Sequence, residues 1–138
     1  MKQRSIFLLC LLALAGILGW YYFHAASGVQ IQTIPCADIT KGCGNQQLQI
    51  HFDRTPQVMK PFNLSAKATS ASEVHASFAM QGMEMGLNRY RLLQRPDGLW
   101  QAEVTLPVCI QGRSDWLMEL EVKTPQGMQR YQLPFSSR

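Results

Sequence analysis

The stretch Trp116-Leu-Met-Glu-Leu-Glu-Val-Lys-Thr-Pro-Gln-Gly-Met-Gln-Arg-Tyr-Gln-Leu133 decides the fold class. Trp116 and every second residue after it up to Val122 are apolar, and two of the three residues between them are glutamates, which is the pattern of a strand with one buried face. In Thr124-Pro-Gln-Gly127 the proline presets one φ angle and the glycine tolerates a positive φ, as a tight turn requires. We therefore predict a β-hairpin over residues 116–133.

The same period of two recurs upstream. Alternating segments cover residues 48–53, 62–69 and 100–106, and Arg95-Pro-Asp-Gly98 predicts a second hairpin between residues 89–94 and 99–106. The segment 73–80 fits a strand or a helix, but Gly82 and Gly86 favour a strand followed by a loop. With about seven short strands, we expect an all-β domain at 36–138, a small antiparallel β-sandwich of the immunoglobulin or cupredoxin kind.

The N-terminus carries a different pattern. Residues 6–23 (IFLLCLLALAGILGWYYF) contain no charge, and as a helix they would extend about 27 Å, close to the thickness of a bilayer core. Lys2 and Arg4 favour a cytoplasmic tail at 1–5, a transmembrane anchor at 6–23 and a linker at 24–35. The alternative is a cleaved signal peptide, because the segment 25–27 (Ala-Ala-Ser) offers small residues to a peptidase. Both interpretations export the C-terminal domain.

Charge and cysteines are consistent with export. The net charge is +4, but Lys2 and Arg4 precede the apolar run, so the rest carries 11 of the 13 Lys and Arg against 9 Asp and Glu. Without a basic cluster, nucleic-acid binding is not expected. The spacing favours a Cys36–Cys43 disulfide and leaves Cys109 as a single thiol. We predict a single-pass protein of the bacterial inner membrane with a periplasmic C-terminal domain.

Three methionines are the strongest candidates for a binding site. Met80, Met83 and Met85 lie within six residues of one another, and thioethers are soft ligands suited to Cu(I) in an oxidising compartment. His75 could add an imidazole from the adjoining strand, with His51 as a second possible nitrogen donor. The alternative is that these methionines fill gaps in the core, as methionine often does.

Catalytic patterns are missing from the sequence. No serine stands in a nucleophile elbow, no glycine-rich phosphate loop follows a strand, and the Cys and His spacing matches no common zinc site. We therefore do not expect an enzyme.

Three motifs in the second half of the chain suggest a family. These are the methionine segment from Phe78 to Tyr90, Gly98-Leu-Trp100, and Gly112-Arg-Ser-Asp-Trp116. Together they resemble the FixH/YtkA-like group. The resemblance implies a small membrane-anchored or exported β-sandwich domain associated with copper handling and the assembly of respiratory haem-copper oxidases. It also implies a turn at Gly112 and Arg113, and a core anchor at Trp116.

These observations lead to one leading hypothesis and two alternatives. The leading hypothesis is a membrane-anchored periplasmic domain that binds Cu(I) through Met80, Met83, Met85 and His75. It would pass the ion to a respiratory oxidase subunit or a copper chaperone, or help to assemble the oxidase. The first alternative is a metal-free accessory or interaction subunit of a membrane complex. The second is a thiol-redox assembly factor that uses Cys36, Cys43 and Cys109.

Overall fold

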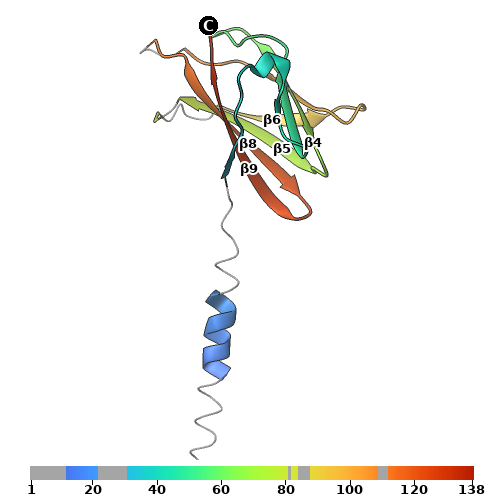
Figure 1. Ribbon diagram of the computed structural model, residues 1–138, viewed down its shortest axis with the longest axis vertical. Helices are drawn as coiled ribbons and strands as arrows, with labels where there is room; N and C mark the ends of the chain where they lie inside the picture. Colours follow the sequence, from blue (N-terminus) through green and yellow to red (C-terminus); the bar gives the residue numbers. More distant parts are fainter. Residues whose placement is uncertain (1–11, 22–30, 81, 84–87, 109–111) are drawn as a thin grey trace, which may run out of the picture.

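The computed structural model describes residues 12–21, 31–80, 82–83, 88–108 and 112–138. Residues 12–21 form an α-helix, and the later segments form a β-domain (Figure 1). The elements of the β-domain are β1 (Ile31–Thr33), η1 (Ile39–Lys41, a 3-10 helix), β2 (Cys43–Gly44), β3 (Leu48–Phe52), β4 (Phe62–Ala68), β5 (Glu73–Met80), β6 (Arg89–Gln94), β7 (Trp100–Val104), β8 (Asp115–Thr124) and β9 (Gly127–Ser136).

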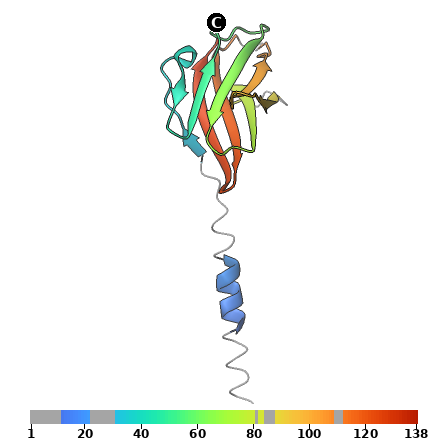
Figure 2. The same cartoon turned by 90° about the vertical axis from the view of Figure 1, so that its right-hand side faces the viewer.

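These strands form one curled nine-stranded sheet in the order β1-β9-β8-β5-β6-β7-β4-β3-β2. The curl occurs at β6, because residues 89–92 of this strand pair with β5 whereas Leu93 and Gln94 pair with β7. The half of the sheet made by β1, β9, β8 and β5 therefore faces the half made by β7, β4, β3 and β2. Figure 2 shows the two halves one behind the other, like an incomplete barrel.

The core lies between the two halves and is rich in aromatic rings. Phe52 of β3 contacts Phe135 of β9 with ring centroids 5.4 Å apart, and Phe62 of β4 lies 6.3 Å from Phe78 of β5. Trp116 is buried beside them, and its indole N–H donates to the hydroxyl oxygen of Ser137 at 3.1 Å. Burial of these large apolar surfaces is the main force that closes the sheet on itself.

Both predicted hairpins are confirmed. In the first, Arg95 N–H donates to the carbonyl oxygen of Leu99 at 2.7 Å, and Gly98, at φ +83°, donates to the carbonyl of Arg95. In the second, β8 and β9 pair along their whole length from Asp115 to Thr124. The segment 73–80 is a strand, and its apolar side chains alternate inward as the sequence predicts.

Three expectations need correction. The sheet has nine strands instead of about seven, because β1 and β2 are only three and two residues long and are too short to show an alternating pattern. It is mixed instead of antiparallel, since β1 runs parallel to β9. Residues 31–33, expected within the linker, belong to the sheet, and the Ile34 N–H donates to the carbonyl oxygen of Gln132 at 2.8 Å.

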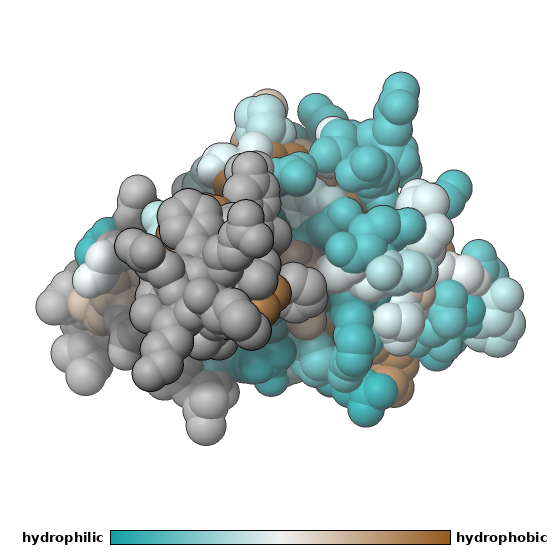
Figure 3. Space-filling model, turned by 90° about the horizontal axis from the view of Figure 1, so that it is seen from below, coloured by the Kyte–Doolittle hydropathy of each residue, from teal (hydrophilic) through white to brown (hydrophobic). Residues whose placement is uncertain are grey.

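The helix at residues 12–21 exposes its apolar side chains, whereas the β-domain presents polar ones. Seen from below in Figure 3, hydrophilic side chains predominate on the visible part of the β-domain. Among the described residues, no helix combines the length and the apolar character needed to cross a bilayer. The tail at 1–5 and the ends of the predicted anchor, residues 6–11 and 22–23, lie outside the described residues.

Candidate functional site

Met80, the first of the predicted sulfur ligands, lies inside the core. It is the last residue of β5, it is 1% exposed, and its partner on β8 is the buried Trp116. Its position follows from the alternation of β5, in which every even-numbered side chain from Val74 onward points inward. The thioether of Met80 therefore packs among apolar side chains.

Met83 follows Met80 in a tight turn. The Met83 N–H donates to the carbonyl oxygen of Met80 at 2.9 Å, and Gly82 takes a φ of +77°, which glycine adopts without strain. The Met83 side chain is partly buried and packs against the edge of the core. Met85 lies outside the described residues.

His75 lies on the opposite face of β5 from Met80. Its partners across the sheet are Arg91 on β6 and Glu121 on β8, and its Nε2 atom lies 3.8 Å from a carboxylate oxygen of Glu73. His75 and Met80 are five positions apart, about 17 Å along a strand, and an odd spacing places the two side chains on opposite faces. The structure therefore does not bring His75 and Met80 together.

The predicted copper site is thus not assembled in the part of the chain that the structure describes. Within that part, no group of three or more His, Cys, Asp or Glu side chains could hold a metal ion. With Met80 in the core and His75 on the far side of the sheet, Met83 is the described methionine candidate that remains partly exposed. Copper binding stays a prediction that rests on Met83 and Met85.

The predicted disulfide between Cys36 and Cys43 is confirmed. The two Cα atoms are 5.4 Å apart, and the chain between them forms η1. Asp38 caps η1, because its carboxylate accepts hydrogen bonds from the hydroxyl and the N–H of Thr40 at 2.6 and 3.0 Å. These bonds, the hydroxyl one foremost, hold the pKa of Asp38 below its usual range. Cys109 lies outside the described residues.

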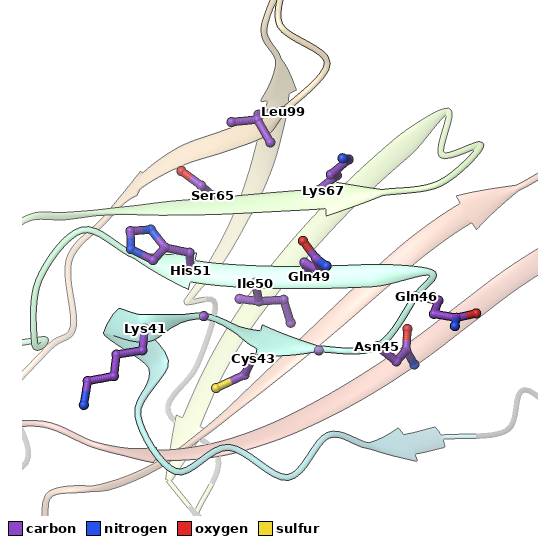
Figure 4. Close-up of a pocket in the computed structure, with 12 residues that line it drawn as sticks. Lys41, Cys43, Asn45, Gln46, Gln49, Ile50, His51, Ser65, Lys67 and Leu99 are labelled. Atoms are coloured by element: carbon purple, nitrogen blue, oxygen red, sulfur yellow. The ribbon is translucent and has the colours of Figure 1, made fainter.

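Next to this disulfide the structure shows a groove that the sequence analysis did not identify. It has a volume of about 770 Å³ and lies on the outer face of β2, β3 and β4 (Figure 4). Four polar side chains form its floor in two pairs of directly opposed residues, Gln49 with Lys67 and His51 with Ser65. Lys41, Asn45 and Gln46 lie at its margin, and none of the described residues that line it carries a carboxylate.

The outer face of the other half of the sheet is charged in a different way. There the arginines pair with carboxylates, as in the ion pairs Arg89 with Glu121 at 2.5 Å and Arg130 with Glu121 at 3.0 Å. Arg91 lies 3.9 Å from Glu73 in the same array. With Glu119, which lies 3.8 Å from Arg130, three arginines meet three carboxylates on this face.

Comparisons with known proteins do not assign the chain to a family. No family model matches it, and no curated protein matches it. Among solved structures it is similar to an engineered protein, a target of the Northeast Structural Genomics Consortium, with a TM-score of 0.49 and 15% sequence identity over 69% of this chain. The chain spans 21% of that protein's length. A similarity of this extent carries no argument, so any function must be argued from the residues.

Proposed function

We propose that this chain is a membrane-tethered domain that acts outside the cytoplasm as a non-enzymatic interaction subunit of a membrane complex. The observation that carries the proposal is the apolar helix at residues 12–21. Its large side chains are exposed, with Leu12 70%, Ile17 64% and Trp20 65% accessible to solvent. A helical surface of this kind needs an apolar environment, and a bilayer supplies one.

The Cys36–Cys43 disulfide supports the location. Disulfides persist in oxidising compartments such as the periplasm and are rare in the cytosol. Together with Lys2 and Arg4 before the apolar run, it supports a single-pass protein of the bacterial inner membrane whose β-domain is periplasmic.

The curled sheet also supports a finer proposal about the fold and the partner. Its two facing halves around one aromatic core are compatible with an immunoglobulin-like or cupredoxin-like sandwich. The motif resemblance to FixH/YtkA-like domains would then make a respiratory oxidase subunit the partner to test first.

Topology and retention in the membrane test the tether. The full chain should stay with membranes after alkaline carbonate washing. An alkaline phosphatase fused to the C-terminus should be active, because this enzyme folds in the periplasm. A fluorescent protein fused at the same place should be dark, because it does not fluoresce when it is exported unfolded. Release into the carbonate supernatant, or an inactive phosphatase fusion, would overturn the proposal. The partner complex should be recovered by cross-linking equally well with and without a copper chelator.

Copper handling is the second candidate function, and the turn at Met80–Met83 is the observation that favours it. This turn leaves the Met83 thioether partly exposed, two residues before Met85. The test is the Cu(I) affinity of the full chain and of Met83→Leu and Met85→Leu variants, with Met128→Leu as the control. Met128 is 43% exposed in the hairpin at the other end of the sheet. Equal affinities in all four proteins would end the copper hypothesis.

A further inference from the structure

The groove on the outer face of β3 and β4 has the properties of a ligand site, and it stands apart from the methionine segment. Its floor is fixed by strand register, because Gln49 lies opposite Lys67, and His51 lies opposite Ser65. Opposed side chains on neighbouring strands start about 5 Å apart, and residues two apart on one strand lie about 7 Å apart. The four polar groups thus share one compact area, as Figure 4 shows.

Of the two lysines that line the groove, Lys41 lies 3.6 Å from a carboxylate oxygen of Asp38, whereas the charge of Lys67 is not neutralised from within the described part of the chain. Lys67 forms no ion pair there, whereas the arginines on the other outer face are paired with carboxylates. Glu103 lies opposite Asn63, four residues and about 13 Å along β4 from Lys67. Asp53, at the same end as Asn63, is bonded to Arg54 and Asn63. The cationic end of the groove is therefore open to an external anion.

The remaining lining groups supply hydrogen-bond donors. The Ser65 hydroxyl oxygen already accepts from the Gln101 amide at 3.2 Å, so its own hydrogen can be donated. The Asn45 side-chain oxygen accepts from the N–H groups of Gln47 and Leu48, which leaves its NH₂ group as a donor. Lysine binds phosphate as a point charge, and a phosphate offers more acceptor oxygens than a carboxylate to the several donors that line the groove.

We propose that this groove binds a phosphate group carried on a polar, hydroxyl-bearing moiety of the size of glycerol phosphate. Lys67 holds the phosphate, Ser65 and His51 donate to it, and the amides of Gln49 and Asn45 bind the hydroxyl groups. The volume of about 770 Å³ leaves room beside a phosphate for the additional moiety. The inference rests on the sheet face alone and holds with or without a tether or a metal.

Lysine footprinting on the full chain tests the proposal at the level of single residues. The chain, kept in uncharged detergent micelles, is acetylated with increasing glycerol 3-phosphate, or with phosphatidylglycerol added to the micelles, and each lysine is quantified by mass spectrometry. Lys67 should be protected several-fold, while Lys60 and Lys123, which lie outside the groove, should be unchanged. Protection by the soluble ester indicates a free phosphorylated ligand, and protection by the lipid alone indicates a headgroup.

Matched variants give an independent readout by calorimetry. Lys67→Gln should weaken binding of the protecting ligand about tenfold, as expected for the loss of a charge-assisted hydrogen bond. Lys123→Gln, which removes the same charge from the other half of the sheet, should leave the affinity unchanged. Equal protection of all lysines, equal losses in both variants, or no protection by either ligand would overturn the proposal.

Discussion

Substitution of Met80 tests whether this methionine packs in the core or binds a metal. The side chain is 1% exposed and opposes Trp116, so truncation to alanine would remove three buried groups and leave a cavity against an indole ring. Each buried methylene-sized group contributes about 0.8 kcal/mol to the free energy of unfolding, so the loss of three such groups lowers it by about 2 kcal/mol. The cavity adds to this, so Met80→Ala should lower the free energy of unfolding by about 3 kcal/mol, within the usual range for such truncations.

Two further variants separate packing from metal binding. Met80→Leu keeps the volume, so it should cost less than about 1.5 kcal/mol and leave any Cu(I) affinity unchanged. Met83→Ala, at a partly buried position three residues away, should cost about 1 kcal/mol or less. The free energies come from urea unfolding of the full chain in uncharged micelles, followed by tryptophan fluorescence. A loss below about 1 kcal/mol for Met80→Ala, or loss of Cu(I) binding in Met80→Leu, would refute the packing argument.

Three other perturbations have defined outcomes. Reduction of the Cys36–Cys43 disulfide, which closes a loop with a sequence separation of seven, should cost about 2–3 kcal/mol and lower Tm; a double alanine variant should then be insensitive to reductant. Trp116→Phe loses the bond to Ser137 and should cost about 1–2 kcal/mol in the same urea assay, and an unchanged midpoint would contradict it. Burial raises the pKa of Asp53, but hydrogen bonds donated by its neighbours outweigh it and lower the pKa overall. The Asp53 carboxylate therefore stabilises the fold fully above the ordinary carboxyl pKa, and this contribution is lost as the pH falls through the lowered pKa. Asp53→Asn should accordingly flatten the decline of Tm between about pH 5 and 3.

The strands that could be predicted are the ones long enough to alternate. The alternation of β8 and the turn chemistry of Thr124–Gly127 were sufficient to locate the longest hairpin. β2 has two residues, pairs with β3 and begins at Cys43 of the disulfide. Its Gly44 is so close to the next strand that an added Cβ would lie 2.0 Å from the carbonyl oxygen of Leu48. Such an edge depends on a disulfide and on a close backbone approach, which periodicity does not record.

The predicted metal site illustrates which part of a site a sequence determines. The crowding of methionines is visible in the sequence. The odd spacing of His75 and Met80 is visible there too, and once β5 is taken as a strand this spacing places the two side chains on opposite faces of the sheet. The groove could not be predicted from spacing along one strand, because it depends on which residues of neighbouring strands lie opposite each other. That Gln49 lies beside Lys67 depends on the register of β3 and β4, and this register is supported by the bond from the Asn63 N–H to Asp53 at 2.8 Å.

The direction of β1 determines where these candidate sites lie relative to the point at which the chain joins the sheet. Because β1 is parallel to β9 and Ile31 lies opposite Arg130, the chain joins the sheet near the hairpin that contains Met128. Met80 lies opposite Trp116, which in turn opposes Phe135, five residues and about 17 Å further along β9. A tethered domain would therefore carry the methionine turn away from the point of attachment. A partner that took copper from Met83 would have to reach that far end, whereas a partner that bound the groove would contact the side of the sheet.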